Sequence, residues 1–114
     1  MPELTADELR CMREADQDLV VINVLAAEDH REQHIPSSVN VPLDREHFVE
    51  EVLALAGSKD AKVVVYCASS TCRVSPRAAK KLEQAGFRRI YNLAAGIQGW
   101  REAGLPVESE LARP

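Results

Sequence analysis

The chain has 114 residues, a length that predicts one domain with a single hydrophobic core. Its apolar content of 46% and charged content of 28% are ordinary for a folded globular protein. The net charge of -4, with no basic run, argues against a nucleic-acid partner, and no stretch of about 18 apolar residues predicts a membrane span. Residues 1–4 lack the features of an export signal, so we expect a cytoplasmic protein.

The cysteines and histidines decide which thiol or metal chemistry is open to the chain. Cys11, Cys67 and Cys72 make an odd count, which, without an export signal, favours reduced thiols over a disulfide scaffold. We expect Cys11 to be a small apolar residue of the first helix. No metal or other cofactor is expected, because the histidines lie well upstream of the later cysteines without a spacing typical of ligands: His30, His34 and His47.

The first half of the chain predicts alternating helices and strands. Thr5 and Glu8 form a capping box that starts a helix of about ten residues. A strand over 19–24 is apolar on both faces, which is typical of a central strand in a parallel sheet. A short helix, a turn, a short strand and a helix that is capped by Asp44 and closed by Gly57 then follow, over 26–33, 34–38, 39–41 and 44–57.

The second half continues the alternation around one polar loop. A β-branched strand over 63–66 leads into a seven-residue loop, after which Ser75 and Pro76 predict the N-cap and first turn of a helix. That helix ends at Gly86, and a strand and a short helix follow, over 90–93 and around 97–100. The pattern predicts a three-layer α/β fold, a parallel sheet flanked by helices, over residues 1–107, with a frayed tail over 108–114.

The loop after the 63–66 strand is the candidate site. Parallel α/β sheets bind ligands beyond the carboxyl ends of their strands, and Cys67 lies there. Loop amides, the start of the next helix and the charge of Arg73 are all features that lower a cysteine pKa, so we expect a reactive thiolate at Cys67. The expected anion-binding loop consists of Ala68, Ser69, Ser70, Thr71, Cys72 and Arg73.

Cys72 is a second thiol on the same loop, and its role stays open between a resolving thiol and an ordinary loop residue. A disulfide with Cys67 requires that the two Cα atoms lie within about 7 Å. No histidine or aspartate flanks Cys67, so the sequence gives no local support for a protease-like dyad.

Five blocks of sequence, in order, resemble single-domain rhodanese-like proteins. They are 19–24; 34–42; 64–67 with Arg73 and Ser75; 78–82 before Gly86 and Phe87; and 93–97 with Trp100 before 104–106. The resemblance implies a rhodanese-like α/β domain in which Cys67 accepts a sulfane sulfur as a persulfide and passes it on. The implied partners are a small-molecule sulfur donor, such as thiosulfate, and a small-molecule or protein acceptor.

Two departures from the family pattern bear on function and fold. The family's first strand usually ends in Asp-Val-Arg, whereas here the residues are Asn23, Val24 and Leu25, a change that affects fold support more than chemistry. The family's loop usually has six residues from cysteine to arginine, whereas the span from Cys67 to Arg73 has seven. The longer loop is also typical of cysteine phosphatases and related arsenate reductases.

Three functional hypotheses follow from these features. A sulfurtransferase or persulfide carrier is favoured, because Tyr66 stands where a phosphatase signature normally has histidine and no loop residue is an obvious general acid. Oxyanion chemistry at the seven-residue loop is the first alternative. A non-catalytic redox or sulfur-sensing module is the second.

Overall fold

Strand β4 lies at the centre of a five-stranded parallel sheet and leads directly to the candidate loop. The structure, a computed structural model, describes residues 2–110. The strand order is β1-β5-β4-β2-β3, and every neighbouring pair is parallel. The strands are β1 (Glu3–Leu4), β2 (Val20–Asn23), β3 (Val39–Asn40), β4 (Lys62–Tyr66) and β5 (Arg89–Leu93).

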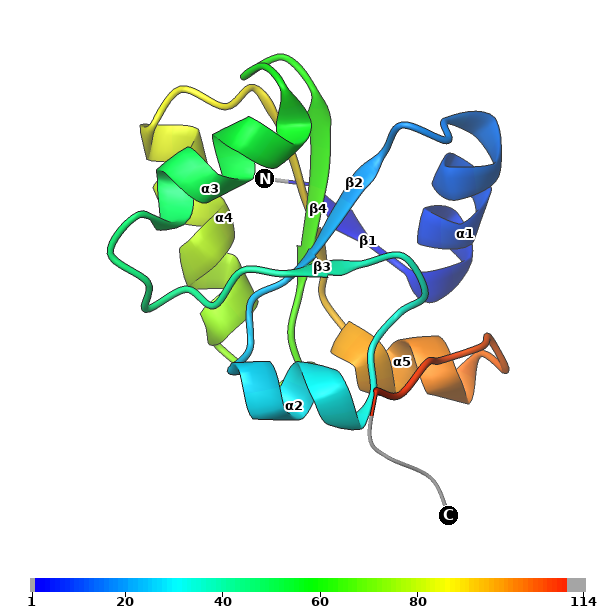
Figure 1. The fold of residues 1–114 in the computed structure, drawn as a ribbon. Helices are drawn as coiled ribbons and strands as arrows, with labels where there is room; N and C mark the ends of the chain where they lie inside the picture. Colours follow the sequence, from blue (N-terminus) through cyan, green and yellow to red (C-terminus); the bar gives the residue numbers. More distant parts are fainter. Residues whose placement is uncertain (1, 111–114) are drawn as a thin grey trace.

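Helices cover both faces of the sheet, as Figure 1 shows, so the three-layer α/β prediction is confirmed. One core lies under α3 and α4 and includes Phe48 and Leu82; the other lies under α1 and α5 and includes Leu9 and Trp100. The short helix α2 crosses the carboxyl end of the sheet (Figure 1). The helices are α1 (Ala6–Ala15), α2 (Ala27–Glu32), α3 (Phe48–Ala56), α4 (Val74–Gln84) and α5 (Gly96–Glu102).

Local signals in the sequence correctly marked several helix ends. The capping box of Thr5 and Glu8 is present in both directions, with N···O distances of 2.8 and 3.1 Å. Gly57 ends α3 in the left-handed conformation. Gly86 is also left-handed, and the N–H of Phe87 donates to the carbonyl of Leu82 at 3.1 Å, which closes α4 in a Schellman motif.

Two expected helix caps are wrong. Helix α3 begins at Phe48, not near Asp44, because residues 43–47 form turns, including the bond from the Arg45 N–H to the Pro42 carbonyl. Helix α4 begins at Val74 after Arg73, so Ser75 lies inside the first turn and is not the N-cap. Its hydroxyl is therefore free to contact the candidate site.

The two ends of the described chain depart from prediction. Strand β1 was not expected; Leu4 pairs with Leu93 at the edge of the sheet. The expectation of fraying from residue 108 is wrong for 108–110, because Glu108 exchanges backbone bonds with His34 and the Glu110 N–H donates to the Arg31 carbonyl. Residues 111–114 of the expected tail lie outside the described range. Each helix within residues 2–110 is too short or too polar to reach across a bilayer.

Candidate active site

The backbone of the Cys67 loop is clamped by the start of α5. The carbonyls of Cys67 and Ala68 accept hydrogen bonds from the N–H groups of Ile97 and Gln98, at 2.9 and 3.0 Å. Cys67 follows the last residue of β4 and is only 1% exposed. The thiol is therefore held at the carboxyl end of the central strand, as predicted, on a backbone that is fixed at its first two residues.

Gly96 permits this close approach, a role that the sequence alone did not predict. A Cβ atom at Gly96 would lie 2.5 Å from the Cys67 carbonyl oxygen and 2.6 Å from the Ser69 nitrogen, where no side chain fits. Gly96 also has φ +63°, in the left-handed region that favours glycine. The position thus joins α5 to the loop through backbone contact.

Tyr66 organises the buried polar groups beneath the loop. Its hydroxyl accepts hydrogen bonds from the side-chain amide of Asn23 at 3.2 Å and the N–H of Ile35 at 3.1 Å, and lies 2.7 Å from the Ser38 hydroxyl. Asn23 also accepts from the Leu25 N–H at 2.9 Å. Burial raises the pKa of Tyr66, which keeps the phenol neutral. These bonds support the strand end that carries Cys67. Asn23 takes part in them as a neutral side chain, at the position where the family usually has an aspartate.

The environment of Cys67 differs from the expected one. Its thiol donates to the Ser75 hydroxyl at an S···O distance of 3.3 Å. Burial raises the pKa of the Cys67 thiol, and a hydrogen bond to Cys72 raises it further, while Ser75 lowers it. The expected lowering of this pKa is therefore wrong for the resting site, because burial outweighs the polar groups. Arg73, expected to supply a charge, is exposed at the start of α4.

Polar groups of the loop act on Cys72 more favourably than on Cys67. They are the neighbouring Cys67 side chain and the backbone amides of Ala68, Val74 and Ser75. These groups lower the pKa of Cys72 despite the opposing effect of burial. Amides of the loop that were expected to stabilise the Cys67 thiolate thus also act on a second thiol, Cys72.

The remaining loop residues form its outer wall. The hydroxyls of Ser69 and Thr71 lie 3.0 Å apart, and the Cys72 N–H donates to the Ser69 carbonyl at 3.1 Å, which closes a turn. Ala68 and Ser70 are exposed. These residues lie on one loop as predicted, although their hydroxyls point along the loop wall and make no bond to either thiol among the described contacts.

Two hollows flank the loop. A groove of about 390 Å³ touches Leu25, Asp29 and Val74. A smaller hollow of about 180 Å³ touches Ala68, Asp29 and Glu32. Ala68 of the loop lines the smaller hollow, Val74 directly after the loop lines the groove, and Asp29 of α2 lines both.

His30 and His34 were not expected to share a ligand-like arrangement, yet the structure brings them together with Glu110. Their candidate ligand atoms lie within 4.8 Å of one another. The two rings stack at a centroid distance of 4.0 Å and an angle of 13°, so their in-plane lone pairs run side by side rather than converge. One ring would have to turn before both could bind a single ion, and the geometry is that of a buried stack closed by residues 108–110.

Comparisons with known proteins agree with this geometry. The family model for the rhodanese-like domain matches residues 5–103. The chain is 32% identical to an HTH-type transcriptional regulator of Mycobacterium tuberculosis over 92% of this chain and 44% of that protein. It is 27% identical to a sulfurtransferase of Allochromatium vinosum over 92% of each. The chain spans about half the length of the first curated relatives that it matches.

A solved structure supports the same relationship. The crystal structure of a thiosulfate sulfurtransferase from Pseudomonas aeruginosa superposes with a TM-score of 0.85 at 25% identity, covering 99% of this chain and 21% of that one. The family model covers most of the chain. The chain belongs to the rhodanese-like domain family.

Proposed function

We propose that the domain moves sulfane sulfur through a persulfide on Cys67, as a sulfurtransferase or persulfide carrier. The observation that carries this proposal is the position of Cys67, buried directly after the central strand, with its carbonyl bonded to the start of α5 and its thiol on the Ser75 hydroxyl. A persulfide needs donors that stabilise negative charge on its outer sulfur. The backbone amides of Ala68, Val74 and Ser75, which lower the pKa of the nearby Cys72, are the donors that we expect to do so.

In the proposed reaction, the Cys67 thiolate attacks the outer sulfur of a thiosulfate-type donor. The sulfur–sulfur bond of the donor breaks, sulfite leaves with the electron pair, and Cys67 carries the transferred sulfur. A nucleophile such as cyanide or a thiolate then takes that sulfur and restores Cys67. Ser75 stabilises the attacking thiolate, and the 68–73 loop binds the anionic adduct.

The setting that we propose is the cytoplasm, with a small-molecule donor and either a small-molecule or a protein acceptor. A reducing compartment suits a chain whose three cysteines are all free thiols. Relatives that are named as a sulfurtransferase and a putative sulfur carrier support this class of partner.

The test measures thiocyanate formed from thiosulfate and cyanide by the wild type, Cys67→Ala and Cys11→Ser. We expect turnover by the wild type and by Cys11→Ser, whose exposed thiol lies on α1, and none by Cys67→Ala. Intact mass after thiosulfate alone, in a Cys72→Ser background, should show a cyanide-labile gain of one sulfur atom. Absence of both thiocyanate and the sulfur adduct, with the Cys67 thiol intact, rejects the proposal.

The oxyanion alternative rests on the seven-residue loop. Cys72 precedes Arg73 in that loop, and loop amides that a tetrahedral oxyanion would need lower the pKa of its thiol. Turnover of an aryl phosphate that disappears in Cys67→Ser would favour the alternative instead.

A further inference from the structure

The smaller of the two hollows adjoins the backbone of Cys67. Its volume is about 180 Å³, and its lining residues include Ala68 and Ile97. Ala68 follows Cys67 in the chain, and the N–H of Ile97 donates to the Cys67 carbonyl at 2.9 Å. The Cys67 side chain is only 1% exposed, so we expect a molecule that takes sulfur from it to approach along this hollow.

The charged side chains that line this approach are all acidic. Asp29 and Glu32 of α2, the helix that crosses the carboxyl end of the sheet in Figure 1, line the hollow. Asp29 and Asp44 line the neighbouring groove of about 390 Å³, which shares Leu25 and Asp29 with the hollow. Neither set of lining residues includes a lysine, an arginine or a histidine.

These three carboxylates are not paired with a cation within residues 2–110. Asp29, Glu32 and Asp44 take part in none of the ion pairs of the described residues. Arg73, the cation of the loop, is exposed at the start of α4 and lines neither space. A molecule that approaches the loop here therefore meets unpaired negative charge, and Asp29 contributes to it in both spaces.

Resting on the function proposed above, we propose that the sulfur acceptor is a small aminothiol, a thiol that also carries an ammonium group, and that Asp29 selects it. The acceptor thiolate attacks the outer sulfur of the Cys67 persulfide and forms a new sulfur–sulfur bond. The bond from the outer sulfur to Cys67 breaks, and Cys67 keeps its electron pair as a thiolate. The ammonium group binds at the Asp29 carboxylate and takes no part in the bonds that change.

Charge and size both favour this class of acceptor. A cleft lined by charges of one sign raises the local concentration of molecules of the opposite sign. An anionic thiol is repelled by the same carboxylates, and a neutral thiol gains nothing from them. The hollow of about 180 Å³ is smaller than the roughly 300–1,000 Å³ of sites that hold drug-sized ligands, so it suits an acceptor of a few atoms.

The half-reaction with the acceptor can be measured alone. Protein is loaded with thiosulfate, freed of the excess donor and mixed at low ionic strength with cysteamine, 2-mercaptoethanol or mercaptoacetate, which are cationic, neutral and anionic. Loss of the cyanide-labile sulfur gives each rate constant, which is divided by that of the same thiol with a small neutral disulfide. We expect cysteamine to exceed 2-mercaptoethanol about fivefold, the effect of one contact between unit charges in water, and mercaptoacetate to react most slowly. The differences should shrink at about 0.5 M salt, which screens exposed charges.

Asp29→Asn tests the assigned residue, because it keeps the size of the side chain and removes its charge. The variant should lose most of the preference for cysteamine and should load with thiosulfate, a dianion, faster than the wild type. Asp29→Glu should retain the preference. Asp18→Asn is the matched control, since it removes the same charge from an exposed position before β2, at the opposite end of the strand from the loop, and should behave like the wild type.

The inference is overturned if the wild type shows no preference for cysteamine, or if Asp29→Asn keeps the preference as fully as Asp18→Asn. A preference lost equally in Asp29→Asn and Asp29→Glu would also overturn it, because the negative charge would then not be the cause. If no protein gains a cyanide-labile sulfur in the loading step, the proposed function itself fails, and this inference fails with it. Circular dichroism establishes that each variant is folded.

Discussion

The side-chain amide of Asn23 donates a hydrogen bond to the hydroxyl of Tyr66 across strands β2 and β4, which pair in register at these two residues. Tyr66 precedes Cys67 directly, and both strand residues are fully buried. The same hydroxyl receives the N–H of Ile35 from the turn before β3. One phenol thus ties three segments together beneath the thiol.

Tyr66→Phe tests this junction. The change leaves the Asn23 amide and the Ile35 N–H without their acceptor in a buried site, and an unsatisfied buried donor costs about 1–3 kcal/mol. We expect the free energy of unfolding in urea to fall by about that amount. Tyr91→Phe is the control, because the half-buried Tyr91 hydroxyl makes no hydrogen bond among the described contacts. Equal stability of the two variants would contradict the role of Tyr66.

Gly96→Ala tests the contact between α5 and the loop. We expect loss of both stability and sulfur transfer, because the new Cβ would overlap the Cys67 carbonyl and the Ser69 nitrogen. Gly104→Ala is a matched control, since Gly104 has a similar φ of +79° but open space around it. Left-handed strain alone costs about 1–2 kcal/mol and is present in both variants. A larger loss of unfolding free energy in Gly96→Ala than in Gly104→Ala therefore reports the clash. Activity in Gly96→Ala equal to that in Gly104→Ala would argue against the clamp.

Ser75→Ala tests how Cys67 ionises. The Ser75 hydroxyl accepts from the neutral thiol and can turn to donate to the thiolate, which lowers the pKa of Cys67. Without it the pKa rises, and the rate of persulfide formation at neutral pH should fall about tenfold if the lost bond contributes ~1.4 kcal/mol. The rates of wild type and variant should converge at high pH, where both thiols ionise. A deficit that persists equally at every pH would indicate a structural role.

His30 makes stability depend on pH. Burial and the neighbouring His34 lower the pKa of His30 in the folded protein, although Glu110 opposes them. As the pH falls through the ordinary histidine value of ~6.5, the unfolded chain takes up a proton that the folded chain resists, so stability falls. His30→Phe, which keeps an aromatic ring, should reduce the loss of unfolding free energy between about pH 7.5 and 5.5.

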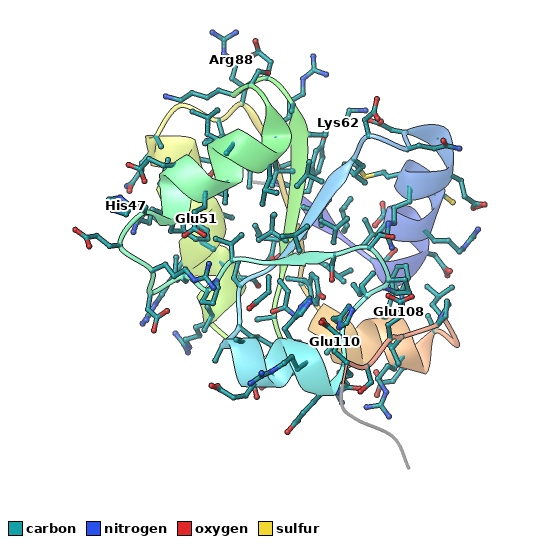
Figure 2. All side chains as sticks on the ribbon, in the orientation of Figure 1. His47, Glu51, Lys62, Arg88, Glu108 and Glu110 are labelled. Carbon is teal, nitrogen blue, oxygen red and sulfur yellow. The ribbon has the colours of Figure 1, made fainter. Side chains whose placement is uncertain are left out.

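The control for that measurement is His47→Gln. His47 is exposed beside α3, away from Glu108 and Glu110, as Figure 2 shows. Removal of the His47 imidazole should leave the loss of unfolding free energy toward low pH as large as in the wild type. A His30→Phe protein that loses stability toward low pH as steeply as His47→Gln would show that His30 does not carry the effect.

Features encoded within a few residues were predictable from the sequence, whereas those that depend on distant segments were not. The capping box at Thr5 and the Schellman close at Gly86 depend on neighbours in the chain, and both are present. Ser75 looked like a cap because serine before proline favours one, but its burial against Cys67 sets its place within the helix. Strand β1 has only two residues and takes its conformation from pairing with β5.

The same distinction applies to the site. The sequence placed Cys67 at a strand end and the loop amides after it, since both follow from chain order. It did not reveal that loop amides would lower the pKa of Cys72 while burial raises that of Cys67, because the path of a seven-residue loop depends on its contacts with α5. His30 and His34 gained carboxylate neighbours only when residues 108–110 folded back along α2.

The burial of Cys67 at the end of a rigid strand has a consequence for delivery. In the proposed reaction, the sulfur carried by Cys67 stays at this buried position, because Cys67 directly follows β4 and its backbone is fixed there. Under the proposed function, the acceptor therefore brings a slender reactive group to the loop along the hollow that Ala68 lines together with Leu25 and Asp29. A small thiol or an extended chain end meets this requirement, and a flat folded surface does not.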